Sequence, residues 1–473
     1  MNNFATTTST RLQNRSLIDM DRDHLIHPLT SFRGHEARGV TLLQSGKGMW
    51  LTDADGHQLL DAFAGLWCVN VGYGQESIVE AAAEQMRRLP YATGYFSFGS
   101  EPAVRLAEEL VRLSPPSLQH VFFTLGGSDA VDSAVRYIVH YFNAIGKPSK
   151  KHFIALGHGY HGSSAISSGL TAIAAFHRNF DVPLRWQHHI PSPYPYRSDV
   201  GHDPAAAIAR SVAELKAKVG ELGADNVAAF FCEPIQGSGG VIVPPPGWLK
   251  AMRDACKELD ILFVADEVIT GFGRTGPMFG CEHEDVSPDL MTVAKGLTSG
   301  YAPMGAVLMS DQVYQGIAEG AATDVPIGHG FTYSGHPVSA AVGLEVLRLY
   351  VEGGILENGQ KVGARFQAGL DAIANHPLVG ETRGRGLLAA IELVADKTTK
   401  ARFDPELRVA SRLFERGYAN GIIFRAFTDG IIGLAPALCC NDDEMDLIFE
   451  RVRRTLDGLL EEPDIRSAVV EVA

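Results

Sequence analysis

Five short apolar runs between residues 120 and 296 place the strongest limit on how this chain can fold. Each run ends in glycine or polar residues, and a stretch with helical spacing separates it from the next. The runs are HVFFTLGG (120–127), HFIALGHG (152–159), VAAFFCEPIQG (227–237), ILFVADEV (261–268) and LMTVAKG (290–296). Continuous apolar runs indicate strands that are covered on both faces. Their alternation with helices predicts an α/β fold with a mainly parallel central sheet.

The two ends of the chain follow a different pattern. Residues 48–67 predict two short strands joined by a turn at Asp55-Gly56. Residues 75–90 predict a helix that ends at Pro90 and carries Val79, Ala82, Met86 and Leu89 on one face. A long helix is expected over residues 338–353, followed by apolar segments at 385–394 and 421–436.

The last predicted helix begins at Asn441. Glu444 follows three residues later, which is the capping-box pattern. The buried stripe of this helix is predicted to be Met445, Ile448, Phe449, Val452 and Leu456. We therefore expect a large domain over residues 76–335 and a smaller α/β domain assembled from residues 1–75 and 336–473.

Composition and charge narrow the class of function. The 473 residues are 45% hydrophobic and 20% charged, which suits a core-forming protein. The formal net charge of −14 argues against a nucleic-acid-binding surface, which would be basic. The six cysteines form no Cys-x-x-Cys pair, and neither a signal peptide nor a bilayer-spanning run is recognisable. We expect a cytoplasmic protein that handles small molecules, without membrane or nucleic-acid partners.

Chemically informative residues follow the apolar runs, where ligands bind in doubly wound sheets. Gly126, Gly127 and Ser128 come after the first run and open a helix. Backbone N–H groups at a helix N-terminus form a site for an anion such as phosphate. A tight turn with a Ser or Asp cap is the alternative, and the sequence leaves both open.

A carboxylate pair, Asp266 and Glu267, follows the fourth run. A buried carboxylate needs a cationic partner, because an isolated one is very costly. The alternative is a salt bridge that holds the end of the sheet together. Residues 271–276 also match the dinucleotide-binding pattern G-x-G-x-x-G, but Pro277 makes a poor helix start, so a nicotinamide site is not favoured.

Aromatic and histidine side chains follow the second run. Tyr160 and His161 lie there, and His158 with His161 is too small a set to indicate a metal, so stacking or hydrogen bonding is favoured and no metal is expected. Considered singly, Trp67 indicates a half-buried aromatic residue and Arg425 a surface or salt-bridged arginine.

Lys295 is the only lysine between Lys257 and Lys361, and it lies in an apolar stretch. Desolvation lowers the pKa of a lysine below its reference value of about 10.4, and the neutral amine is a nucleophile that forms Schiff bases. A buried ion pair with Asp266 is the alternative. A phosphate cradle, a buried carboxylate, an aromatic residue and such a lysine are together what pyridoxal 5'-phosphate (PLP) requires.

The sequence resembles the class III, or omega, aminotransferases, and it is most similar to the amine:pyruvate and β-alanine:pyruvate branch. The resemblance extends from about Leu25 to Leu460 and implies the fold type I architecture of PLP-dependent transferases. The motifs that carry it are GLWCVNVGYG, GGSDAVDSAVR, GYHGSS, EPIQGSGGVIVPP, VADEVITGFGRTG, AKGLTSGYAPMGAV and GFTYSGHP.

The resemblance also implies roles for individual residues. Lys295 would be the Schiff-base lysine, and Asp266 would pair with the pyridine nitrogen. Thr332 would reach the phosphate held by a neighbouring subunit, which implies an obligate homodimer with sites at the interface. The remaining cofactor contacts would be Gly127, Ser128, Tyr160, His161, Glu233, Val268 and Phe331. The substrate pocket would be lined by Trp67, Tyr160, Ile269 and Arg425, with Arg425 available to a substrate carboxylate.

The implied activity is a ping-pong transfer of an amino group from an amine or omega-amino acid to pyruvate, which gives alanine and an aldehyde or ketone. Ile269 stands where ornithine and 4-aminobutyrate relatives carry Gln, which supports the pyruvate branch. Asp129 replaces a frequent Glu, and Leu29 a frequent aromatic residue. A decarboxylase or aminomutase on the same fold is the alternative, and a nicotinamide oxidoreductase is less favoured. The donor, and whether dimers pair into tetramers, stay open.

Overall fold

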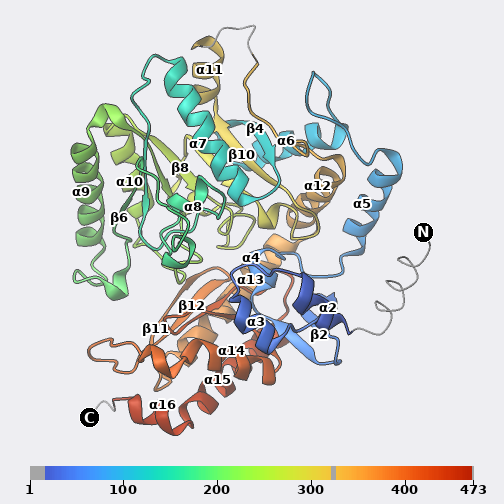
Figure 1. The fold of residues 1–473 in the computed structure, drawn as a ribbon, viewed down its shortest axis with the longest axis vertical. Coiled ribbons are helices and arrows are strands. Elements are labelled where there is room, and N and C mark those ends of the chain that lie inside the picture. The colour runs from blue at the N-terminus through green and yellow to red at the C-terminus, as the bar shows by residue number, and fades with distance from the viewer. Residues whose placement is uncertain (1–15, 321–325, 471–473) are drawn as a thin grey trace, which may run out of the picture.

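The computed structural model describes residues 16–320 and 326–470. Its largest sheet has seven strands in the order β4-β10-β9-β8-β7-β5-β6 (Figure 1). The strands are β4 (Leu118–Thr124), β5 (His152–Leu156), β6 (Gln187–Ile190), β7 (Val227–Cys232), β8 (Leu262–Asp266), β9 (Leu290–Val293) and β10 (Gly305–Ser310). Only β10 is antiparallel to its neighbours within this sheet. All five apolar runs form strands, and the predicted mainly parallel α/β sheet is confirmed.

Two strands of this sheet are not predicted by the sequence analysis. β6 has the sequence QHHI, in which two half-buried histidines interrupt the apolar pattern. β10 has the sequence GAVLMS and is buried along its whole length, but it belongs to the apolar stretch that begins before Lys295. Apolarity alone therefore does not separate this strand from the preceding one.

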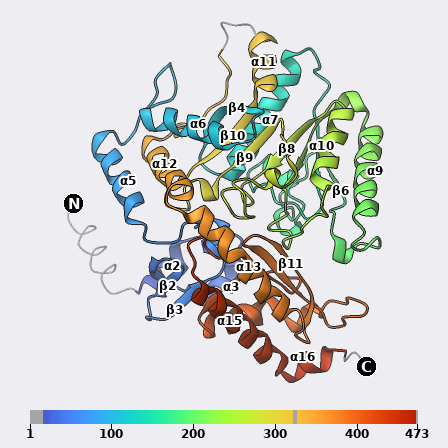
Figure 2. The same ribbon diagram turned by 180° about the vertical axis from the view of Figure 1, so that it is seen from behind.

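Helices cover both faces of the large sheet, as the two opposite views show (Figures 1 and 2). Within β8, Phe263 and Ala265 join the core cluster beneath α10, whereas Val264 joins the cluster beneath α7. Burial on both faces explains why these strands have continuous apolar runs. The helices around this sheet are α6 (Glu101–Leu113), α7 (Gly127–Ala144), α8 (Ser167–Leu170), α9 (Pro204–Leu222), α10 (Trp248–Glu258) and α11 (Asp311–Gly320).

Two smaller four-stranded sheets are built from strands of the N-terminal and C-terminal parts of the chain. The first has the order β1-β2-β3-β13 and the second β11-β12-β15-β14. Their strands are β1 (Leu43–Lys47), β2 (Trp50–Asp53), β3 (Gln58–Asp61), β11 (Val379–Arg385), β12 (Leu388–Leu393), β13 (Ile422–Ile423), β14 (Arg425–Ala426) and β15 (Ile431–Leu434). The predicted hairpin at Asp55-Gly56 is confirmed, and β13 pairs in parallel with β3. N- and C-terminal elements consequently lie side by side in both views (Figures 1 and 2). The domain boundaries stay a prediction.

The other helices are α2 (Leu17–His24), α3 (Phe32–Arg38), α4 (Ala64–Trp67), α5 (Glu76–Arg88), α12 (Pro337–Val351), α13 (Ile355–Ile373), α14 (Val409–Ala419), α15 (Asp442–Leu460) and α16 (Pro463–Ala468). Asn441 caps α15 in a capping box with Glu444, as predicted, and four residues of the predicted stripe are buried while Phe449 is half-buried. None of the helices among residues 16–320 and 326–470 is long and apolar enough to cross a bilayer.

The apolar face predicted for α5 is only partly covered in this single chain, where Ala82 packs against the core. Val79 and Met86 are 47% and 58% exposed, and the helix instead buries Ile78 and Gln85 against α12 and its surroundings. An apolar helical face of this kind usually contacts another surface. Its exposure bears on the assembly considered below.

Candidate active site

Four neighbouring strands of the large sheet end at one edge and carry the predicted site residues. Lys295 follows β9, Asp266 ends β8, Glu233 follows β7, and Tyr160 and His161 follow β5. The parallel register places Asp266 opposite Thr292, and the Glu267 N–H donates to the Thr292 carbonyl oxygen at 2.9 Å. The strand order, rather than the sequence order, brings these residues together.

Asp266 is a buried carboxylate whose two oxygens are both engaged. Oδ2 accepts a hydrogen bond from His161 Nδ1 at 2.8 Å, and Oδ1 accepts from the Val268 N–H at 3.1 Å. Burial disfavours the charged imidazole, but the hydrogen bond to Asp266 and the charges of Asp266 and Glu233 together outweigh burial and raise the pKa of His161. His161 Nε2 is also buried and has no hydrogen-bond partner in the described chain. No ion pair between Asp266 and Lys295 is found among the described residues, so the alternative of a buried salt bridge between them is not supported.

Lys295 is held in an unusual backbone conformation at the end of β9. Its φ is +40°, in a region that side-chain-bearing residues seldom adopt. Burial lowers the pKa of Lys295, although the nearby Asp266 and Glu233 carboxylates act in the opposite direction. A lysine with a lowered pKa more readily supplies the neutral amine that acts as a nucleophile or base. Backbone strain of this kind occurs frequently at functional sites.

Glu233 follows β7 at this edge and accepts hydrogen bonds from the loops that follow β5 and β7. Its Oε1 accepts from the Tyr160 N–H at 3.0 Å, and its Oε2 accepts from the Gly237 N–H at 2.9 Å. Burial raises the pKa of Glu233 to about 7, with His161 opposing the shift and Asp266 adding to it. Glu233 therefore supports the backbone that presents Tyr160 rather than pairing with a cation.

The raised pKa of Glu233 gives a pH-dependent stability. The unfolded carboxyl titrates near 4.5 and the folded one near 7, so this contribution is complete below pH 4.5 and is lost as the pH rises through 7. At about 1.4 kcal/mol per pKa unit, the rise from 4.5 to about 7 corresponds to a loss of at most about 3.5 kcal/mol. We expect Glu233→Gln to remove this pH dependence of the free energy of unfolding. Denaturant unfolding of the apoprotein between pH 4.5 and 8 would measure it. Glu108→Gln, at an exposed glutamate, should keep the wild-type dependence; a wild-type slope in Glu233→Gln would contradict the assignment.

The N-terminus of α7 is an open cradle of backbone N–H groups. Gly126 is the N-cap and provides no side-chain acceptor, and the Asp129 carboxylate accepts from the Leu125 N–H instead. The Ser128 hydroxyl accepts from the Ser163 N–H at 3.2 Å. The structure therefore does not show the alternative of a turn capped by Ser or Asp. Val268 closes one side, since a Cβ at Gly127 would lie 3.0 Å from its Cγ1.

An apolar wall adjoins the strand ends. Ile269 and Trp67 belong to one buried cluster, and Trp67 is only 3% exposed, so it is more buried than its sequence context suggested. A Cβ at Gly433 would lie 2.9 Å from Trp67 Cη2, 2.8 Å from Phe427 Cε2 and 3.4 Å from Arg425 Cβ. These three side chains therefore converge on β15 beside Ile269.

Arg425 is the only charged residue among these three side chains. Its guanidinium carbon lies 5.4 Å from the centre of the Phe427 ring, and burial lowers the pKa of Arg425. No ion pair of Arg425 with a carboxylate is found among residues 16–320 and 326–470, so it is not the salt-bridged arginine that one alternative predicted. A half-buried arginine on an aromatic face is well placed to accept a carboxylate from a small molecule.

The structure does not bring Phe331 and Thr332 to these strand ends. The Phe331 ring lies 6.4 Å from that of Phe122, and Thr332 is exposed, with its carbonyl oxygen accepting from Tyr91 Oη at 3.0 Å. The G-x-G-x-x-G stretch at 271–276 forms turns with no helix directly after it. Its Arg274 is buried and donates to the carbonyl oxygen of Leu387, which gives the stretch a structural role.

The donor set of this edge fits PLP. The open α7 cradle suits a phosphate. The Asp266 carboxylate is buried beside a histidine and lacks a Lys or Arg partner in the described chain, which suits a protonated pyridine nitrogen. The half-buried Lys295, whose pKa is lowered by desolvation, suits an aldehyde carbon.

Comparison with known proteins supports the same interpretation. The family model described as aminotransferase class-III matches residues 33–456. The chain belongs to the class III aminotransferases. Among its relatives, a putrescine–pyruvate aminotransferase from Pseudomonas aeruginosa is 41% identical over 449 residues, which cover 95% of this chain and 97% of the relative. A diaminobutyrate–2-oxoglutarate transaminase from Halomonas elongata is 37% identical over 465 residues, which cover 96% and 99%.

The solved structures agree. The crystal structure of an omega transaminase from Pseudomonas jessenii, in complex with PMP, matches with a TM-score of 0.92 and 38% identity over 94% of this chain and 99% of that one. As a class III aminotransferase, this protein is a PLP-dependent enzyme that exchanges an amino group between an amine or amino acid and a keto acid. The fold type I expectation is confirmed, and the decarboxylase, aminomutase and nicotinamide alternatives are not favoured.

Two residues of the apolar wall beside the strand ends, Phe427 and Gly433, are not predicted from the sequence. Phe427 lies 360 positions from Trp67 in the chain, and no local pattern links a glycine in an apolar strand to either aromatic ring. The only sequence signal is the glycine itself, because a glycine in a strand interior frequently marks a place where another part of the structure approaches the backbone closely.

Proposed function

We propose that this aminotransferase moves an amino group from an amine or omega-amino acid to pyruvate, with Lys295 and Asp266 as its catalytic residues. The observation that carries the proposal is the half-buried Arg425, which lies on an apolar wall without a carboxylate partner in the described chain. The similarity to a putrescine–pyruvate aminotransferase supports the choice of acceptor.

Each residue at the edge has a proposed task. PLP, when bound, supplies an electron sink for the bond that breaks at the amine carbon. Lys295 Nζ takes the proton from that carbon in the first half of the exchange and returns a proton to the acceptor carbon in the second half. Its lowered pKa keeps a neutral amine accessible for this task. Asp266 keeps the pyridine nitrogen protonated, and His161 holds the Asp266 carboxylate in place.

The phosphate is proposed to lie at the N-terminus of α7. Gly127 and Ser128 provide N–H groups and a hydroxyl there, and Val268 packs against the backbone of Gly127. Tyr160 would lie against the ring, since its backbone is fixed by Glu233. These assignments leave Glu233 as a positioning residue rather than a direct proton carrier.

The wall sets the proposed substrate range. Trp67 and Ile269 give an apolar surface that suits an uncharged amine side chain. Arg425 suits the carboxylate of pyruvate, because the guanidinium fork binds a carboxylate in bidentate fashion. One pocket would thus receive an apolar donor and an anionic acceptor in turn.

We expect Arg425→Ala to raise KM for pyruvate about 10- to 100-fold and to change KM for an amine without a carboxylate less than about threefold, since a charged hydrogen bond contributes about 1.5–3 kcal/mol. Steady-state assays of alanine formation, with pyruvate and 2-oxoglutarate compared as acceptors, would measure this.

Arg402→Ala is the matched control, because Arg402 is a partly exposed arginine that pairs with Asp429 at 3.0 Å. It should leave both KM values unchanged. Equal effects of Arg425→Ala on donor and acceptor, or a wild-type enzyme that prefers 2-oxoglutarate, would refute the proposed acceptor site.

We also propose a homodimer in which Thr332 and Phe331 serve the partner's site. Thr332 is exposed, and its carbonyl oxygen accepts a hydrogen bond from Tyr91 of its own chain. The partly uncovered apolar face of α5 and the nearby Phe96, which is 86% exposed, give a surface suited to a second copy. All six cysteines are free, which supports the proposal of a reducing, cytoplasmic location.

A further inference from the structure

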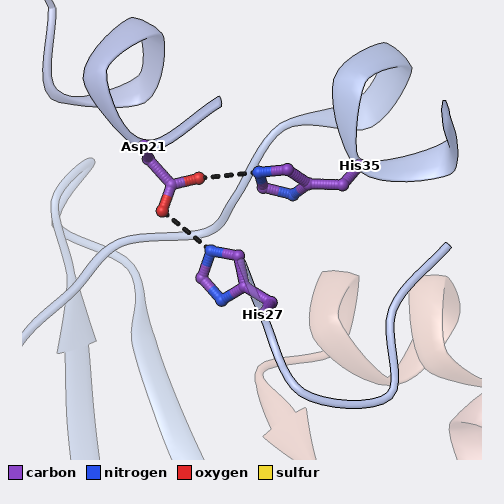
Figure 3. Close-up of side chains that lie close together, drawn as sticks. All are labelled: Asp21, His27 and His35. Atoms are coloured by element: carbon purple, nitrogen blue, oxygen red, sulfur yellow. Dashed lines mark hydrogen bonds and ion pairs between the residues drawn. The ribbon is translucent and has the colours of Figure 1, made fainter. Parts of the chain in front are cut away.

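The N-terminal helices α2 and α3 are joined by a polar cluster outside the active site. The cluster consists of Asp21 on α2, His27 in the connecting loop and His35 on α3. Figure 3 shows the Asp21 carboxylate between the two rings, with one oxygen directed at each. Asp21 Oδ1 lies 2.8 Å from His27 Nε2, and Oδ2 lies 2.9 Å from His35 Nε2.

The second of these contacts is incomplete. Asp21 Oδ2 and His35 Nε2 are both buried, and neither has a hydrogen-bond partner of acceptable geometry in the described chain. Their side chains are only 8% and 10% exposed, so water reaches them poorly. Buried polar atoms without a partner are costly. A carboxylate oxygen and an imidazole nitrogen therefore lie 2.9 Å apart without a completed hydrogen bond, and a bound cation would satisfy both.

The donor set is suited to a metal ion. One ligand atom from each residue lies within 4.8 Å of the others. Two imidazoles and a carboxylate are the ligands that Zn²⁺ and related divalent transition metals favour, whereas Ca²⁺ and Mg²⁺ favour oxygen ligands alone. His27 is 28% exposed, which leaves an entry path and space for a water ligand.

The surrounding structure gives such an ion a task. Neither α2 nor α3 buries a single residue, so these two helices lack an apolar core of their own. Short segments without a core commonly depend on a metal or on oligomerisation for stability. We propose that Asp21, His27 and His35 form a structural binding site for a divalent transition-metal ion of the zinc type, which clamps α2 to α3.

A second cluster provides the contrast. Asp53, Asp55 and His57 are equally close together. However, Asp53 Oδ1 already accepts from the N–H groups of Asp55 and His57, both at 2.9 Å, and Oδ2 accepts from Tyr418 Oη. His57 is also 60% exposed. With its lone pairs engaged, this cluster is expected to bind no metal tightly.

The test uses the PLP-loaded enzyme after chelator treatment and removal of the chelator. Equilibrium dialysis against micromolar Zn²⁺, followed by elemental analysis, should find one tightly bound zinc per chain, and excess Mg²⁺ should not displace it. His35→Gln should weaken this binding about 100-fold or more, since even loss of an outer partner costs 10- to 100-fold. His57→Gln is the matched control and should bind zinc as the wild type does.

Limited proteolysis gives a second test, because it measures whether the metal ion holds α2 and α3 together. Trypsin cuts after Arg22, Arg33 and Arg38, all within this segment. Zn²⁺ should slow these cuts in the wild type and in His57→Gln but not in His35→Gln. If His35→Gln is poorly folded, His27→Gln gives the same test at a more exposed ligand. No tight zinc in the wild type, or equal zinc binding by His35→Gln or His27→Gln, would overturn the proposal.

Discussion

Replacement of Lys295 by alanine is expected to lower turnover by up to about 10⁴-fold while the fold is retained. The magnitude follows from the loss of a group that transfers protons at the reacting carbon, which alone contributes up to about 10⁴-fold. The side chain follows β9 at a strained backbone position, with φ of +40°. Removing it relieves burial of an amine, so stability should not fall. Steady-state turnover and thermal unfolding of the variant would measure both expectations.

Lys150→Ala is the matched control for this variant. Lys150 is buried, and its Nζ donates to the carbonyl oxygens of Ala224, Val227 and Asp260, at 3.3, 3.1 and 2.7 Å. Its removal leaves carbonyl groups without a partner, so we expect a loss of roughly 2–4 kcal/mol in the free energy of unfolding. Turnover per folded molecule should stay near the wild-type value. Substantial activity in Lys295→Ala would contradict the assignment of Lys295 as the residue that transfers the proton.

Replacement of Asp266 by asparagine is expected to lower turnover by about 10²- to 10³-fold, the cost of removing one fixed charge from the reacting centre. Asparagine keeps the shape and can still accept from the Val268 N–H, but it carries no charge for the pyridine nitrogen. The pKa of His161 should also fall, because the hydrogen bond to Asp266 is among the causes that raise it. Turnover measurements and NMR titration of His161 in the apoprotein would test these two effects.

Asp289→Asn is the control for Asp266→Asn. Asp289 is also a buried aspartate of the same sheet, but it lies at the start of β9, where its Oδ2 accepts from the Phe263 N–H and its Oδ1 from Arg253. We expect this variant to lose stability by about 1–3 kcal/mol and to keep its turnover. Equal losses of turnover in the two variants would show that any buried carboxylate of the sheet has this effect, which contradicts a specific role for Asp266.

Much of the site could be predicted because its signals are local. A strand that ends in glycine or in a charged residue places that residue at the carboxyl edge of a parallel sheet, and this signal predicts Lys295 and Asp266. Glu233 is indicated only by the family resemblance. The pairing of His161 with Asp266 was not located in this way. It depends on β5 and β8 lying two strands apart in the sheet, which no segment of sequence encodes alone.

The unpredicted features depend on contacts between distant segments. The convergence of Trp67, Phe427 and Arg425 on Gly433 joins both ends of the chain. The apolar face of α5 follows the helical period correctly, yet it lies only partly covered in one chain, because periodicity indicates an apolar face but does not name the surface that covers it. The cluster of Asp21, His27 and His35 has no familiar ligand spacing and becomes visible only when α2 and α3 are folded.

The central claim is that the amine of the half-buried Lys295, which follows β9, is the group that bonds the PLP aldehyde. Borohydride reduction of the PLP-loaded enzyme, followed by peptide mass mapping, tests this most directly. We predict a single reduced adduct on Lys295, with no adduct on Lys150, which is also withdrawn from solvent at 2% exposure. An adduct on any other lysine, or reduction that leaves every lysine unmodified, would contradict the account.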